Sequence, residues 1–135
     1  MPGMLRTVIT FGTFDVFHVG HLRVIERAAA LGDRLVVGVS ADALNLRKKG
    51  RAPVFSQAER LAIVAALKPV DEVFVEESLE LKRDYITKFG ADVLVMGDDW
   101  AGRFDEFKDI CEVVYLTRTP AISTTALIEK ISASS

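Results

Sequence analysis

A chain of 135 residues is long enough to bury one hydrophobic core and too short for two ordinary domains. Half of its residues are hydrophobic and 27% are charged, a globular composition that excludes an intrinsically disordered chain. From its length we expect one domain over residues 1–135. The net charge of -2 argues against a general nucleic-acid binder, so any anionic ligand must be held by local groups.

The single cysteine and the lengths of the apolar runs indicate the compartment. Cys111 excludes an internal disulfide and a cluster of cysteine metal ligands, and we expect a small buried hydrophobe rather than a nucleophile. No apolar run approaches the ~20 residues that span a bilayer, and the N-terminus, broken by Pro2 and Gly3, lacks a secretory signal. We therefore expect a soluble cytoplasmic protein that binds no membrane.

Strand and helix patterns alternate through the first half of the chain. The apolar run at residues 5–11 predicts a strand covered on both faces, and apolar residues at helical spacing predict a helix from about residue 19 to residue 31. A second buried strand is predicted at residues 34–39. Residues 40–55 have no apolar period and include the basic run 47–51, so a mobile loop is predicted there.

The same alternation continues in the second half. Ser56 and Glu59 have the spacing of a capping box and predict the start of a helix, which Pro69 ends. Strands are predicted at residues 71–75, 91–96 and 112–116, a helix at 78–89 with Leu79, Tyr85, Ile86 and Phe89 facing inward, a helical turn at 104–108, and a last helix from Ser123.

This order of elements predicts an α/β fold: a single-domain, Rossmann-like, doubly wound, mostly parallel five-stranded sheet with helices on both faces. In such sheets, ligands bind beyond the carboxyl ends of the strands, where the strand order reverses. Polar clusters follow four of the predicted strands, at residues 12–21, 40–51, 97–100 and 117–125. We therefore expect the functional site at that edge of the sheet.

Both histidines of the chain, His18 and His21, lie on either side of Gly20, where the first strand leads into a helix. A helix N-terminus attracts anions, and imidazoles placed there can donate hydrogen bonds to phosphate oxygens that gain charge during transfer. The pattern predicts a phosphate site. Half of a metal site and a purely structural pair are the alternatives. We expect no protein-held metal, because no third histidine or cysteine partner accompanies the pair. We also favour the structural pair less, because chance would rarely place the only two histidines around a glycine between a strand and a helix.

Other local patterns have both a functional and a structural interpretation. Ser123, Thr124 and Thr125 open the last helix and suit phosphate oxygens, or they form a simple N-cap. Arg118 suits a phosphate or is a surface arginine. The basic run suits a phosphorylated ligand or is a solvated face, and Asp99 with Trp100 lines a nucleotide pocket or marks a turn.

Three segments resemble the cytidylyltransferases of the His-x-Gly-His nucleotidyltransferase superfamily, and among them the glycerol-3-phosphate cytidylyltransferases are the closest. The segments are Gly-Thr-Phe-Asp-Val-Phe-His-Val-Gly-His at 12–21, Met-Gly-Asp-Asp-Trp at 96–100 and Arg-Thr-Pro-Ala-Ile-Ser-Thr-Thr at 118–125. Their order matches that of the family, and the likeness covers nearly the whole chain.

The resemblance implies that a phosphate oxygen of a small phosphorylated alcohol attacks the α-phosphate of CTP and releases pyrophosphate, without a covalent enzyme intermediate. Glycerol 3-phosphate is the expected acceptor, Mg²⁺ is expected to bind through the nucleotide phosphates, and a homodimer is implied. Two alternatives stay open: an adenylyltransferase of the same superfamily that acts on a sugar phosphate or FMN, and a nucleotide-binding domain without turnover.

The resemblance also implies roles for individual residues. The catalytic residues would be His18, His21, Lys48 and Arg118. The nucleotide would be bound by Thr13, Phe14, His18, His21, Arg51, Asp99, Arg118, Thr119, Ile122, Ser123, Thr124 and Thr125. The acceptor would be bound by Lys48, Lys68, Lys82 and Trp100, although Lys82 has the alternative of a solvated surface lysine.

The chain departs from the family pattern at two places. Lys68 stands where the family has an arginine, and a lysine cannot make the bidentate phosphate contact of a guanidinium. Pro120 and Ala121 stand where the family has an acidic residue and a glycine. The first departure bears on the acceptor, and the second on the choice between CTP and ATP.

Overall fold

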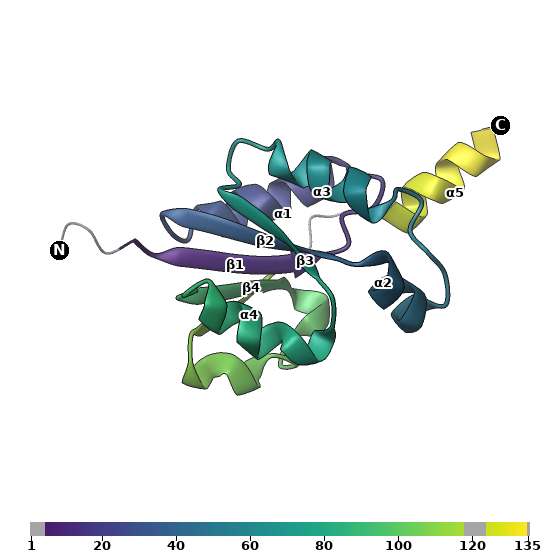
Figure 1. The fold of residues 1–135 in the computed structure, drawn as a ribbon. Helices are drawn as coiled ribbons and strands as arrows, with labels where there is room; N and C mark the ends of the chain where they lie inside the picture. The colour runs from purple at the N-terminus through teal and green to yellow at the C-terminus, as the bar shows by residue number, and fades with distance from the viewer. Residues whose placement is uncertain (1–4, 118–123, 135) are drawn as a thin grey trace.

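The computed structural model describes residues 5–117 and 124–134, which form a five-stranded parallel sheet in the order β3-β2-β1-β4-β5 (Figure 1). The strands are β1 (Thr7–Gly12), β2 (Arg34–Ser40), β3 (Glu72–Glu76), β4 (Val93–Gly97) and β5 (Glu112–Leu116). All four strand pairs are parallel, and the strand order reverses between β1 and β4. This arrangement confirms the predicted α/β, Rossmann-like sheet.

Helices cover both faces of the sheet. They are α1 (Val19–Ala29), α2 (Asp42–Lys49), α3 (Gln57–Ala65), α4 (Lys82–Lys88) and α5 (Thr124–Ser134), with 3₁₀ turns at Leu79–Leu81, Asp98–Trp100 and Asp105–Asp109. Figure 1 shows α1 and α3 on one face and α4 on the other, with α5 extending away from the sheet. In the described part of the chain, no helix is long and apolar enough to cross a membrane.

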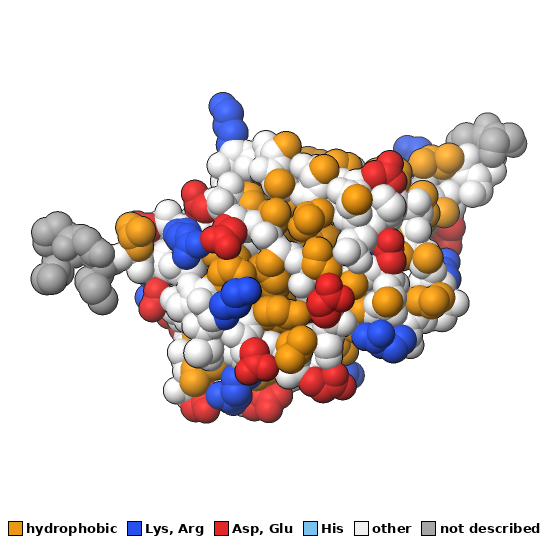
Figure 2. Space-filling view, in the orientation of Figure 1, with side chains coloured by type: hydrophobic (Ala, Val, Ile, Leu, Met, Phe, Trp, Pro, Cys, Tyr) orange, Lys and Arg blue, Asp and Glu red, His pale blue; other side chains and the backbone are white. Residues whose placement is uncertain are grey.

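One edge of the sheet is open. β3 is the outermost strand beyond β2, and no further strand pairs with it among the described residues. Val73, Phe74 and Val75 of this strand are half-buried. Figure 2 shows hydrophobic side chains gathered over the middle of the face on which β3 is the nearest strand, with charged side chains around them.

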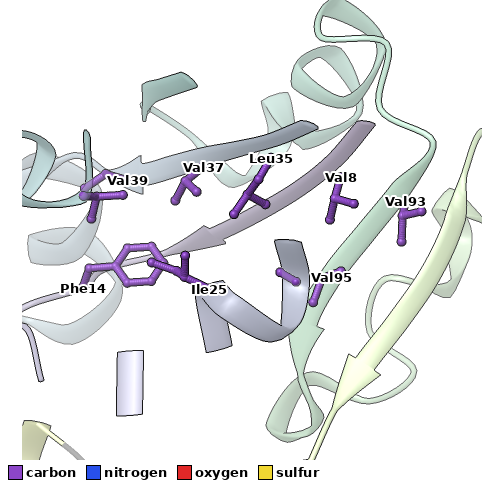
Figure 3. Close-up of a cluster of buried hydrophobic side chains, with 10 residues drawn as sticks. Val8, Phe14, Ile25, Leu35, Val37, Val39, Val93 and Val95 are labelled. Atoms are coloured by element: carbon purple, nitrogen blue, oxygen red, sulfur yellow. The ribbon is translucent and has the colours of Figure 1, made fainter. Parts of the chain in front are cut away.

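Each face of the sheet has its own hydrophobic core, because successive side chains of a strand point to opposite faces. Figure 3 shows the core beneath α1, where Val8, Val37 and Val95 of the strands face Ile25 of the helix. The other core lies beneath α4, where Ile9, Val36 and Leu94 pack with Ile86 and Phe107. Strands buried on both faces explain the continuous apolar runs in the sequence.

The prediction of a loop at residues 40–55 is wrong for its first half, where α2 lies. The helix was missed because it buries one polar residue beside one apolar residue, Asn45 and Leu44, so it shows no apolar period. Tertiary contacts stabilise it instead, since the Asn45 amide donates to the carbonyls of Ser40 and Ala41. Gly50 ends the helix in a left-handed conformation with φ of 74°, which glycine adopts at little cost.

Three smaller predictions need correction. Residue 5 was assigned to the first strand, but Leu5 is 64% exposed and β1 begins at Thr7. The helix predicted at 78–89 begins as a 3₁₀ turn, and Leu79 is exposed rather than inward-facing. Cys111 is half-buried rather than buried, and burial raises the pKa of its thiol, which disfavours a nucleophilic thiolate.

Candidate active site

Two cavities lie at the carboxyl ends of the strands, on either side of the end of β1. The larger cavity has a volume of about 430 Å³ and the smaller one about 190 Å³. They share a wall formed by Phe11, Gly12, Thr13 and Lys49. Gly97, at the end of β4, also lines the larger cavity, so this cavity lies at the point where the strand order reverses.

The loop from β1 to α1 has a strained backbone that one carboxylate holds in place. Phe14 and Val16 have φ values of 54° and 47°, which cost roughly 1–3 kcal/mol each for residues with a side chain. Between them, Asp15 accepts hydrogen bonds from the backbone N–H groups of Val16, Val54 and Phe55 at 3.0, 2.7 and 2.8 Å. Asp15 therefore ties this loop to the segment that lines the outer side of the larger cavity.

The two histidines cap α1 with each other's help. His18 is the N-cap, and its Nδ1 accepts from the backbone N–H of Gly20 at 3.0 Å, while Nδ1 of His21 accepts from the backbone N–H of His18 at 3.2 Å. The rings stack with their centroids 3.9 Å apart. Because each Nδ1 is an acceptor, each neutral ring has its proton on Nε2.

The two Nε2–H groups differ in their surroundings. Nε2 of His18 is buried and has no hydrogen-bond partner among the described residues. His21 lines the larger cavity, and its Nε2 lies 3.5 Å from Oγ1 of Thr124, at the start of α5. Burial lowers the pKa of His18. Burial, and then repulsion from His18, lowers the pKa of His21 to about 4, against a smaller opposing effect of Asp15. Both rings are therefore neutral donors at pH 7.

A ring of polar side chains positions the wall between the cavities. Thr13 Oγ1 donates to Asn45 Oδ1 at 3.1 Å, Asn45 Nδ2 donates to Ser40 Oγ at 2.9 Å, and Ser40 Oγ donates to Thr13 Oγ1 at 3.2 Å. Lys49 Nζ lies 3.5 Å from Thr13 Oγ1. Burial, and then the charges of Lys48 and Arg51, lowers the pKa of Lys49, so a cation stands partly desolvated between the two cavities.

A fully buried arginine joins four segments around the site. The Arg60 guanidinium donates to the backbone carbonyls of Thr13, Ser40 and Phe55 at 2.9, 2.8 and 3.1 Å and to the carboxylate of Asp42 at 2.6 Å. Sequence reasoning missed this residue, although its position one helical turn before the buried Val64 was a signal. Sequence reasoning also missed Asp15, Asn45 and Lys49. The position of Lys49 in the basic run 47–51 was the one signal for any of these three residues.

The structure brings most of the predicted acceptor-binding residues into the smaller cavity. Lys48, Lys82 and Trp100 line it together. Lys82 is 2% exposed and donates to Glu76 at 2.8 Å, so the alternative of a solvated surface lysine is wrong. Lys68 is exposed and lies three residues before Asp71, which forms hydrogen bonds with Leu35 near the start of β2. Lys68 therefore lies at the amino ends of the strands, away from both cavities.

The predicted nucleotide-binding residues fall into three groups. Thr13, Phe14, His21, Arg51, Thr124 and Thr125 line the larger cavity, and His18 lies beside them. Asp99 is exposed in the turn after β4 and lines neither cavity. Four of the predicted residues lie outside the described part of the chain: Arg118, Thr119, Ile122 and Ser123. The two departures from the family pattern at Pro120 and Ala121 lie there too.

Comparisons with known proteins show similarity in sequence and in fold. Residues 9–130 match the family described as cytidylyltransferase-like. The glycerol-3-phosphate cytidylyltransferase of Bacillus subtilis strain 168 is 49% identical over 128 residues, covering 95% of this chain and 98% of that protein. The FAD synthase of Thermococcus sibiricus is 32% identical, covering 92% of this chain and 90% of that protein. The crystal structure of a lipopolysaccharide core biosynthesis protein from Thermoplasma volcanium superimposes with a TM-score of 0.76 at 25% identity, covering 86% and 99% of the two chains.

Arg60→Met should lower the free energy of unfolding by about 2–4 kcal/mol, because buried carbonyls lose their donors while the side-chain volume is kept. Urea denaturation would measure the change. Arg23→Met is the matched control, since Arg23 is exposed and, within the described part of the chain, forms an ion pair with Glu26 alone; it should change stability by at most about 0.5 kcal/mol. Equal effects of the two substitutions would contradict the role given to Arg60.

His21 predicts how stability depends on pH. Because folding lowers its pKa from 6.5 to about 4, only the unfolded chain binds this proton between those values. The contribution of His21 to the free energy of unfolding is therefore fully present above pH 6.5 and is lost as the pH falls toward 4. Denaturation curves at several pH values should show a shallower dependence for His21→Gln than for the wild type. Identical slopes would show that His21 is not the titrating group.

Proposed function

The chain belongs to the cytidylyltransferase-like family, and on that premise we propose that it transfers CMP from CTP to glycerol 3-phosphate, giving CDP-glycerol and pyrophosphate. The observation that carries the proposal is the pair of neutral Nε2–H donors of His18 and His21 at the start of α1, beside the larger cavity. The proposed acceptor is the one named in the Bacillus subtilis relative.

The two cavities suit two substrates that react across their common wall. The larger cavity would hold the nucleotide, and the smaller one, with Lys48 and Lys82, would hold the phosphorylated acceptor. An oxygen of the acceptor phosphate attacks the α-phosphorus, the bond from the α-phosphorus to the bridging oxygen breaks, and pyrophosphate leaves with the electron pair. The acceptor phosphate is already an anion, so the reaction needs no protein base.

The protein's own part in this reaction is positioning and charge stabilisation. His18 and His21 donate to phosphate oxygens that gain charge, and the start of α1 adds a favourable dipole. Lys49 lines both cavities, so it can contact the two reacting phosphates at once. It is therefore a candidate for a further catalytic residue beside Lys48, whereas Arg51, which is predicted to bind the nucleotide, lines the larger cavity alone.

We propose that Mg²⁺ binds through the phosphates of the nucleotide. Among residues 5–117 and 124–134, no group of three or more His, Cys, Asp or Glu side chains could hold a metal ion. Mg²⁺ commonly keeps several waters and binds through substrate phosphates, which suits a site of this kind. When bound, the ion would neutralise part of the triphosphate charge.

We also propose a cytoplasmic homodimer that pairs through the open face beside β3. An unpaired sheet edge with apolar side chains favours association, and Figure 2 shows such side chains gathered there. The half-buried Val73 and Val75 belong to this strand. A single cysteine, Cys111, fits a reducing compartment such as the cytoplasm.

Pyrophosphate release with CTP, Mg²⁺ and glycerol 3-phosphate tests the proposed function. We expect release with this combination, little release when ATP replaces CTP, and CDP-glycerol as the second product in mass spectrometry. The FAD synthase relative favours one alternative, an adenylyltransferase, so the panel includes ATP with FMN and with sugar phosphates. Release in the mixtures with ATP but in none with CTP would establish that alternative. No release with any combination of nucleotide and acceptor would favour a domain without turnover.

His18→Asn tests the Nε2–H donor separately from the helix cap. Asparagine is a good N-cap, so α1 should stay intact, but no donor reaches the place of Nε2. We expect kcat to fall by about 10²- to 10³-fold, as for the loss of one donor to a developing oxyanion. The thermal melting temperature should stay near that of the wild type. Unchanged turnover would contradict the catalytic role of His18.

A further inference from the structure

The smaller cavity contains a buried carboxylate that phosphate binding does not explain. Glu76, the last residue of β3, is 2% exposed and lines this cavity with Lys48 and Lys82. A carboxylate repels an anionic phosphate, and burying it costs free energy unless it is paired. A cavity built for a phosphate alone would do better without Glu76.

The surrounding contacts fix Glu76 in place. Its Oε2 accepts from Lys82 Nζ at 2.8 Å, and both side chains are 3% exposed. Lys82 Nζ also lies 3.7 Å from the centre of the Phe11 ring. The backbone carbonyl of Glu76 accepts from Ala41 at 2.9 Å. The ion pair is therefore a rigid part of the cavity.

This ion pair has hydrogen-bonding capacity to spare. An ionised carboxylate accepts about four hydrogen bonds, and Lys82 is the one side-chain donor to Glu76 among the described residues. Lys82 has three N–H groups, and Glu76 accepts a hydrogen bond from one of them. The ring of Phe11 attracts the positive charge of Lys82 without using a further N–H group. A bound hydroxyl group, which both donates and accepts, complements such a pair.

The geometry of the two cavities decides which end of the acceptor meets the pair. The acceptor phosphate must reach the nucleotide, so it lies at the shared wall near Lys49. Glu76 and Lys82 line the smaller cavity only, and Lys82 Nζ lies over the ring of Phe11 in that wall. Because the carboxylate of Glu76 repels a phosphate, the phosphate lies toward Lys48 and Lys49, and the alcohol portion of the acceptor extends toward Glu76.

We propose that the Glu76–Lys82 ion pair determines acceptor specificity, with Glu76 accepting a hydrogen bond from a hydroxyl group on the alcohol portion. This inference rests on the proposed function. It makes the enzyme selective for phosphorylated polyols. Simple alkyl phosphates lack the donor, and acceptors with a carboxylate at that end are repelled by Glu76.

The test compares glycerol 3-phosphate with n-propyl phosphate, which has the same chain and no hydroxyl group. The wild type should prefer glycerol 3-phosphate in kcat/KM, and Glu76→Gln should reduce that preference by at least about tenfold, as expected for a lost hydrogen bond to a charged group. Lys48→Met should slow both acceptors by the same factor, because it acts on the phosphate. Glu77→Gln, at the exposed neighbouring position, should change neither rate.

The preference between the two acceptors separates recognition from a structural role. A Glu76→Gln enzyme that loses both activities equally, or keeps the full preference, would overturn the proposal. If Glu76→Gln does not fold, Glu76→Asp keeps the charge but withdraws the carboxylate, and it should reduce the preference at least about threefold. A wild type that uses both acceptors equally well would overturn this inference alone. A wild type without CTP-dependent pyrophosphate release would overturn the proposed function and this inference with it.

Discussion

The buried guanidinium of Arg60 links the parts of the chain from which the site is made. It donates to carbonyls at the ends of β1 and β2, to the loop before α3 and to the first residue of α2. A buried charge is tolerated only when its donors are satisfied, so these four segments must meet in one arrangement. Asp15 does the same with opposite charge, since it binds N–H groups of residues 54 and 55. Both cavities depend on this frame.

The frame explains how one small domain offers two kinds of ligand surface. At the start of α1, burial keeps His18 and His21 neutral, so their Nε2–H groups are donors without the charge that would repel Lys49, which lines the larger cavity with His21. On the other side of Thr13, the charges of Lys48, Lys82 and Glu76 lie in one small cavity. Neutral donors suit an oxygen that gains charge during the reaction, whereas an ion pair suits the recognition of polar groups in the ground state.

Predictions from the sequence succeeded where the signal is local. The β-branched runs identified all five strands to within a few residues, and the spacing of Ser56 and Glu59 correctly marked a capping box. They failed where distant contacts decide the outcome. α2 depends on Asn45 bonding to the end of β2, and the burial of Lys82 depends on Glu76 in another element. Neither contact leaves a period in the sequence.

The sequence by itself determined the order of the strands and of the described helices other than α2, the parallel sheet and the placing of two histidines at a helix start. These follow from hydrophobic periodicity and capping, which act over a few residues. Only the tertiary structure decided that Lys49 stands between two cavities, that Lys68 lies at the opposite ends of the strands and that Glu76 lines the smaller cavity with Lys82. The physical reason is that burial and the distances between charges are set by segments far apart in the chain, and they decide whether a lysine is solvated, paired or free to hold a phosphate.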